Sequence, residues 1–262
     1  MRRSFLTPAL WIPAGLAIAL LGLPLVALIV RAPWAQLPEL LGRSEVLQAL
    51  GLSLGTASIA TVVSLVLGIP LALVLARSAD WPAVPRRLLR ALVTVPLVLP
   101  PVVGGVALLL LLGRRGLIGQ FLPFQIPFST SAVVIAQVFV AMPFLVLAVE
   151  GAVRASDRRF ETAAATLGAT RWTILRRVTL PLVAPGVSAG ALLCFTRALG
   201  EFGATITFAG SFPGVTQTLP IATYLELQRD PDAAIALSLT LMVVSVAVLV
   251  TLRDRWVPGL TS

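Results

Sequence analysis

The sequence predicts an all-α integral membrane protein with six transmembrane helices, and two observations support this fold class. Hydrophobic residues make up 58% of the 262 residues, charged residues only 12%, and the mean hydropathy is +0.98. Soluble domains carry about 25% charged residues. The second observation is that long apolar runs alternate with short segments that contain arginine. A transmembrane helix needs about 20 mostly apolar residues, and several of these runs are that long.

Six apolar runs are candidates for transmembrane helices. In chain order they are 4–30, 46–76, 91–113, 131–149, 182–209 and 233–252. The third run contains Pro96, Pro100 and Pro101 near its start, so an unbroken helix is not expected there. Irregular backbone at membrane depth is tolerated where protein or water covers it. This region therefore either lines a pathway or forms a packed kink.

The distribution of arginine predicts the orientation. Of the 20 basic residues, all arginine, 14 lie in the segments assigned to the inside and five in those assigned to the outside. Because positively charged loops stay in the cytoplasm, both termini and the segment 150–181 are expected to be cytoplasmic. A short amphipathic helix is expected within 216–228 near the outer surface, and Asp230 supplies a start signal for the last span.

Missing residue types exclude several functions. The chain has no lysine, so it cannot contain the Gly-Lys-[Ser/Thr] phosphate loop of many ATPases. It has no histidine, the usual general base and the commonest metal ligand. The single cysteine, Cys194, can form neither an internal disulfide nor a thiolate metal site. Any energy source must therefore be an ion gradient or another protein. The arginines are dispersed between apolar runs, which argues against a nucleic-acid partner.

The longest polar interval, 150–181, predicts two short helices that meet at a glycine. Ser156 or Asp157 can cap the first helix, and Thr170 can cap the second. Gly168 lies between them and favours the left-handed conformation that ends helices. Charge pattern alone favours a different interpretation, an amphipathic loop that holds arginines near anionic lipid.

The order of residues in this interval adds a resemblance. Glu161-x-Ala163-Ala164-x-x-x-Gly168, followed by Val178-x-Leu180-Pro181, resembles the EAA motif of the permeases of ABC importers, although that family usually has isoleucine where Val178 stands. The resemblance implies that the interval docks into an ATP-hydrolysing subunit. The residues expected to couple the two subunits are Glu161, Ala163, Ala164, Gly168, Arg171, Val178, Leu180 and Pro181.

The similarity extends over about 46–252 and is strongest to molybdate permeases. The segments 51–77 and 95–105 look like the opening of the permease domain, and 195–228 is most similar to the molybdate members. This implies a type I ABC importer permease fold in a prokaryotic inner membrane. The domains expected are 1–45 (first helix and outer loop), 46–252 (permease core) and 253–262 (a short cytoplasmic tail).

The same resemblance implies an assembly. Two copies form a homodimer with the pathway at their interface, two ATP-binding subunits sit on the cytoplasmic face, and an external oxyanion-binding protein delivers molybdate. ATP and Mg²⁺ bind to the partner subunits, so this chain is expected to hold no cofactor, no metal and no catalytic residue. Transport then proceeds by alternating access.

Two charged residues lie within the fifth predicted span. Arg197 and Glu201 are four residues apart, so each can neutralise the other on one helix face. Unpaired at mid-bilayer, either would cost about 2.5–3.5 kcal/mol. They form either a structural clamp or a pair that briefly contacts the anion. Thr205 and Thr207 are neutral donors suited to transient contacts, although threonines in spans often bond only to backbone.

Alternative functions are a permease for sulfate, thiosulfate or tungstate, a secondary transporter, and an intramembrane enzyme. A secondary transporter needs an ion-coupling site, for which one Arg–Glu pair is little support. An enzyme needs an acid–base or nucleophile pair, and the sequence suggests none.

Overall fold

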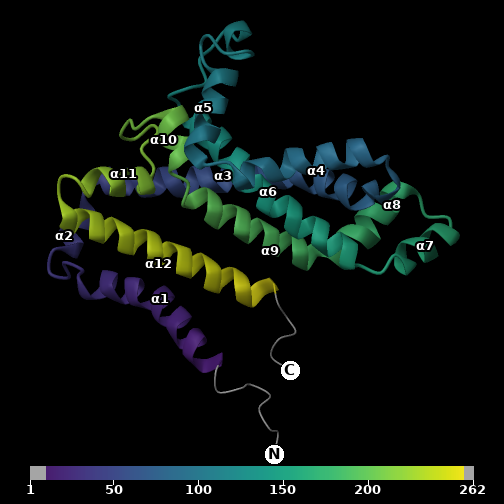
Figure 1. Ribbon diagram of the computed structural model, residues 1–262, viewed down its shortest axis with the longest axis horizontal. Coiled ribbons are helices and arrows are strands. Elements are labelled where there is room, and N and C mark those ends of the chain that lie inside the picture. Colours follow the sequence, from purple (N-terminus) through teal and green to yellow (C-terminus); the bar gives the residue numbers. More distant parts are fainter. Residues whose placement is uncertain (1–9, 257–262) are drawn as a thin grey trace, which may run out of the picture.

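The computed structural model describes residues 10–256, and every regular element in that range is helical (Figure 1). Residues 4–9 of the first predicted span and 257–262 of the predicted tail lie outside the described residues. The longest helices are α1 (Trp11–Val30), α3 (Ser44–Arg77), α6 (Thr130–Ala155), α9 (Leu180–Leu199) and α12 (Pro231–Trp256). The shorter ones are α2 (Leu37–Gly42), α4 (Ala83–Val98), α5 (Pro101–Leu112), α7 (Arg159–Thr166), α8 (Arg171–Ile174), α10 (Gly203–Ala209) and α11 (Leu219–Glu226).

The helices are long and apolar enough for a multi-span membrane protein. Within the described range, five of them could each cross a bilayer, and the bent pair α4–α5 makes six if it counts as one span. The all-α membrane fold predicted from the sequence is therefore confirmed. α11 is the short helix expected within 216–228, and Asp230 starts α12 because its Oδ1 accepts the backbone N–H of Ala233 at 3.2 Å.

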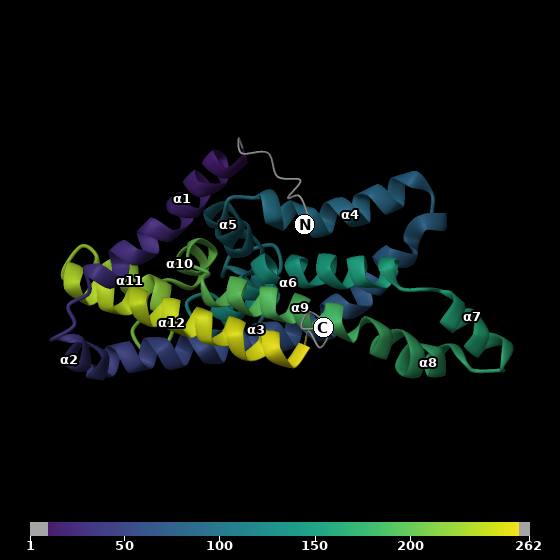
Figure 2. The same cartoon turned by 90° about the horizontal axis from the view of Figure 1, so that it is seen from below.

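The core of the bundle is the side-by-side packing of α3, α6 and α9 (Figures 1 and 2). Small residues let these helices approach closely. A Cβ on Gly68 of α3 would lie 3.1 Å from the Leu145 side chain of α6, and one on Gly190 of α9 would lie 3.0 Å from the same side chain. Close backbone approach through small residues is the main source of helix association in lipid, where the hydrophobic effect gives none.

The peripheral helices are packed less completely. α12 lies against α9 and α11, whereas α1 lies beside α12 at the edge of the bundle (Figure 1). No residue of α1 is buried. This helix therefore presents most of its apolar surface outward.

The third predicted span, 91–113, begins too late, whereas the interruption expected at its prolines is confirmed. α4 begins at Ala83, so residues 83–90, which include Pro85 and lie outside the predicted span, are helical. Proline is tolerated there because the first-turn N–H groups of a helix have no intrahelical partner. α4 ends at Val98, and the next residue, Leu99, has an extended backbone because it precedes Pro100. α5 then leaves at a bend of 118°.

The fifth predicted span, 182–209, is also interrupted. α9 ends at Leu199 and α10 begins at Gly203. The break occurs because Glu201 does not continue the helix. Its Oε1 accepts the backbone N–H of Ala204 at 2.8 Å and so satisfies a donor in the first turn of α10.

α5 and α10 pack across each other at two glycines. A Cβ on Gly105 of α5 would lie 2.7 Å from the Ala204 carbonyl oxygen and 2.7 Å from the Thr207 Cβ. A Cβ on Gly203 of α10 would lie 2.9 Å from the Pro101 Cβ. Real Cβ atoms do not approach this closely, so the crossing depends on the missing side chains.

Substitution of Gly105 by alanine should destabilise the protein by about 1–3 kcal/mol, because the added methyl group forces α5 and α10 apart. Gly51→Ala is the matched control, since a Cβ at Gly51 meets nothing within 4 Å. Thermal unfolding in detergent should give a lower Tm for Gly105→Ala and an unchanged Tm for Gly51→Ala. Equal Tm values for the two variants would contradict the close crossing.

Candidate functional site

The segment between α6 and α9 forms an arm that projects beyond the end of the bundle (Figures 1 and 2). α7 starts after Asp157, whose Oδ1 accepts the Arg159 N–H at 2.9 Å, and it is followed by Gly168 at φ +83°. Thr170 then caps α8 by accepting the Thr173 N–H at 3.3 Å. The two helices that meet at a left-handed glycine are as predicted, but the residue at the N-cap of α7 is Arg158, which makes no side-chain cap, so neither Ser156 nor Asp157 occupies that position.

A π turn, Leu175–Thr179 (η4), joins α8 to α9. It brings Thr179 to the inner side of the arm, where this residue is buried. Turns of this width occur frequently at functional sites.

Glu161 fastens the arm to the bundle. Its Oε1 accepts hydrogen bonds from Nη2 of Arg77, the last residue of α3, at 2.9 Å and from Oγ1 of Thr179 at 2.6 Å. The side chain is about one quarter exposed. A single carboxylate thus joins α7, α3 and the π turn. Sequence reasoning placed Glu161 in the coupling segment but missed Arg77 and Thr179.

Small and large apolar residues are exposed on the arm beside its arginines. Of the predicted coupling residues, Ala163, Gly168, Arg171 and Pro181 are exposed, whereas Ala164, Val178 and Leu180 are half-buried. Large apolar side chains surround them, with Phe160 exposed by 58%, Leu167 by 88% and Trp172 by 68%. No residue of α7 is buried. An exposed apolar surface of this kind marks an interaction site, and the sequence analysis did not identify its three large side chains.

A second ionic cluster lies at the same end of the bundle. The buried carboxylate of Glu150, in the last turns of α6, forms ion pairs with Arg90 of α4 and Arg154 of α6. The sequence analysis did not identify Glu150 as a functional residue. Its four-residue spacing from Arg154 is a local signal for one pair, but nothing in the sequence indicates the pair with Arg90.

Arg197 and Glu201 form the ion pair that their spacing predicts. Nη1 of Arg197 lies 2.6 Å from Oε2 of Glu201, and the side chains are 28% and 1% exposed. No N–H group points at Oε2 with hydrogen-bond geometry, so the contact is an ion pair by distance alone. The other carboxylate oxygen caps α10, as described above. Glu201 therefore both neutralises Arg197 and positions α10.

The two predicted pathway threonines differ in their surroundings. Thr205 is fully buried, and its Oγ1 has no hydrogen-bond partner. Thr207 is half-buried and donates to the Gly203 carbonyl at 2.8 Å. Both lie on α10, and they are separated from the arm by the whole of α9, which is about 30 Å long at 1.5 Å per residue. The predicted site residues thus form two separate groups.

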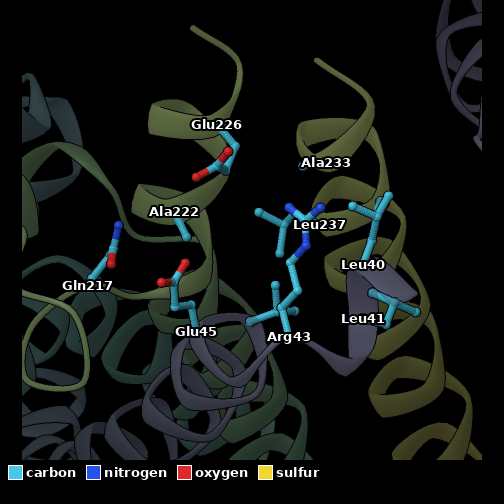
Figure 3. Close-up of a pocket in the computed structure, with 11 residues that line it drawn as sticks. Leu40, Leu41, Arg43, Glu45, Gln217, Ala222, Glu226, Ala233 and Leu237 are labelled. Carbon is cyan, nitrogen blue, oxygen red and sulfur yellow. The ribbon is translucent and has the colours of Figure 1, made fainter. Parts of the chain in front are cut away.

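A small cavity lies at the end of the bundle opposite the arm (Figure 3). It has a volume of about 40 Å³ and lies between α2, the start of α3, α11 and the start of α12. Arg43, Glu45 and Glu226 contribute its charged side chains. A volume of this size holds a few water molecules at most. The cavity contains none of the predicted site residues.

The double role of Glu201 can be separated by two substitutions. Glu201→Gln keeps an oxygen that can accept the Ala204 N–H but loses the charge, whereas Glu201→Ala loses both. We expect Glu201→Ala to be less stable than Glu201→Gln by about 1 kcal/mol, the usual contribution of a cap. Unfolding of the two purified variants in detergent measures the difference, and Glu226→Gln is a control for charge loss elsewhere. Identical stabilities would show that the cap contributes nothing.

Comparisons with known proteins agree with this architecture. Residues 68–258 match the family model described as "Binding-protein-dependent transport system inner membrane component". The molybdenum transport system permease protein ModB of Mycobacterium bovis is 51% identical over 94% of this chain and 93% of its own length. The sulfate transport system permease protein CysT of Escherichia coli is 34% identical over 89% of this chain and 87% of its own length.

Solved structures share the fold at low sequence identity. A bacterial alginate ABC transporter, crystallised in complex with a periplasmic protein bound to an alginate pentasaccharide, contains a chain that is 16% identical. The match has a TM-score of 0.74 and covers 93% of this chain and 91% of that one. From the extent of the family match and the 51% identical relative, we conclude that this chain belongs to the inner-membrane permeases of binding-protein-dependent ABC importers.

Proposed function

We propose that this chain is the permease subunit of an ATP-driven importer of molybdate. The observation that supports this best is the similarity along nearly the whole chain to a molybdenum permease, joined to an arm whose exposed surface is built for a partner. Sulfate or tungstate is the alternative cargo, and the lower identity to the sulfate permease favours molybdate.

The arm is the proposed docking site for ATPase subunits. Ala163, Gly168 and the exposed Leu167 offer a smooth apolar surface that fits a groove, and the nearby arginines can contact acidic groups on its rim. In this proposal ATP and Mg²⁺ bind to the partner, the arm faces the cytoplasm, and the opposite end faces the external binding protein. The arginine distribution supports this orientation.

The proposed transport unit is a homodimer with the pathway between two copies. The bent pair α4–α5 supports this, because many of its apolar side chains are exposed in a single copy. Val93 is the only residue of α4 that is buried, while Val98 is exposed by 84% and Val102 by 52%. A second copy would cover this face, and alternating access would follow from its opening and closing.

Arg197 has a structural role in this proposal. Its charge is already neutralised by Glu201, and only 28% of its side chain is exposed. A free guanidinium would hold a dianion too tightly to release it, since conduction requires weak binding. The oxyanion would instead meet neutral donors such as Thr207 when α10 becomes accessible.

The proposed function is tested by reconstitution of the complex in proteoliposomes. The permease should co-purify with an ATP-binding subunit as a dimer of permeases, measured by mass. Its ATPase activity should rise with molybdate-loaded binding protein. Molybdate should accumulate in the compartment that the ATP-binding subunits face, where hydrolysis occurs. Stimulation by sulfate alone would replace molybdate with the alternative cargo. Uptake that continues without ATP would contradict the ABC mechanism.

Coupling can be tested at Gly168. Its φ of +83° favours glycine, and a Cβ there would meet nothing within 4 Å, so a side chain would project outward toward the partner. Gly168→Trp should lower uptake by about tenfold or more by blocking the docking surface, whereas Gly168→Asn should be mild because asparagine tolerates this conformation. Uptake per ATP hydrolysed is the measurement. Unchanged coupling in Gly168→Trp would contradict the docking role.

A further inference from the structure

Glu150 connects three helices at the arm end of the bundle. Its side chain is only 5% exposed, and its Oε1 lies against Nη2 of Arg90 on α4 and 2.9 Å from Nη2 of Arg154 on α6. Arg154 also donates to the Leu75 carbonyl of α3 at 3.4 Å. Two guanidinium groups thus offset the cost of burying this carboxylate, and without both of them its charge would be uncompensated. The cluster is therefore held together by electrostatics.

α4 depends on this cluster more than its neighbours do. It lies against α6, but Val93 is its single buried residue. Along the same helix Leu88 and Leu92 are 65% and 72% exposed. Apolar packing thus gives α4 little connection to the bundle. Among the described residues, the Arg90–Glu150 pair is the single ion pair that joins α4 to another helix.

The two ends of this ion pair belong to different functional parts of the molecule. On the Glu150 side, α6 ends at Ala155 and leads directly into the arm. On the Arg90 side, α4 leads through the bend into α5, which contacts α10 at Gly105. Arg90 and Glu150 therefore join the arm to the crossing of α5 and α10 without passing through α9.

We propose that the Arg90–Glu150 ion pair transmits movement of the arm to the α4–α5 elbow, so that Arg90 and Glu150 are positioning residues for transport. This inference rests on the proposed function, in which a partner moves the arm. Movement at the arm displaces the end of α6, and the ion pair makes α4 follow. Because α4 is otherwise loosely packed, it can swing as a unit and carry α5 against α10.

The test uses Arg90→Gln in the reconstituted complex, with Arg87→Gln as the matched control. Arg87 lies on the same helix, is exposed, and forms no ion pair in the described structure. In Arg90→Gln, molybdate uptake per ATP hydrolysed should fall by about tenfold, while the ATPase activity changes by less than about twofold. Arg87→Gln should behave as wild type, and Arg90→Lys, which keeps the positive charge, should restore part of the coupling.

A conformational measurement separates transmission from simple stability. In a Val98→Cys background, the rate of labelling by a membrane-impermeant maleimide should differ between the nucleotide-free and the vanadate-trapped complex. Background labelling is low because the one native cysteine, Cys194, is fully buried. Adding Arg90→Gln should abolish this difference. Glu150→Gln should also abolish the difference in labelling rate. The double variant Arg90→Gln/Glu150→Gln should show no loss of coupling beyond that of Glu150→Gln alone.

Three outcomes are distinguishable. If the Arg90→Gln variant takes up molybdate as fast as the wild type and with the same coupling, the inference is overturned and the proposed function is left intact. Reduced uptake with the uptake-to-ATP ratio and the labelling difference both preserved would mean that the pair only stabilises the fold, which also overturns it. Absence of ATP-dependent uptake in the wild-type complex would instead contradict the proposed function.

Discussion

Close packing of α3, α6 and α9 through small residues is the interaction on which the rest of the structure depends. Gly68 and Gly190 both approach Leu145, and the surrounding alanines let the three helices meet without intervening bulk. In lipid this contact is the source of association, because the membrane offers no hydrophobic drive. The result is a closely packed block of helices, to which the arm and α4 are attached with few buried side chains, whereas α10 is largely buried.

Three carboxylates make those attachments. Glu161 binds Arg77 and Thr179, Glu150 binds two arginines, and Glu201 binds Arg197 while it caps α10. Each neutralises an arginine near the end of a helix, and Glu201 in addition satisfies a backbone N–H that the membrane would otherwise penalise. These three carboxylates therefore lie where the arm, α4 and α10 join the closely packed helices.

The sequence predicted the features that local rules determine. Hydropathy located the long helices, Gly168 and Thr170 located the bend of the arm, and four-residue spacing paired Arg197 with Glu201. Contacts between segments that are distant in the sequence could not be predicted from it. Arg77 meets Glu161 across 84 residues and Arg90 meets Glu150 across 60, and no periodicity encodes such pairs.

The errors in the spans have a related cause. Hydropathy does not distinguish one helix from two that follow each other closely, so the break before α10 was missed. The prolines before α5 signalled an interruption but not its 118° bend. The start of α4 was misplaced because an apolar run begins only after the arginines at 86, 87 and 90, although the helix already starts at Ala83 and accommodates Pro85 in its first turn.

The π turn between α8 and α9 has a geometric consequence for how the arm is connected. Such a turn accommodates one residue more than an α-helical turn does. If the π turn changed to regular α-helical geometry, the arm would move by one helical residue relative to α9. This corresponds to a rotation of about 100° about the α9 axis and a shift of about 1.5 Å along it. Thr179, which closes the turn against Glu161, thereby sets the angular phase between the arm and the helix that leads to Arg197.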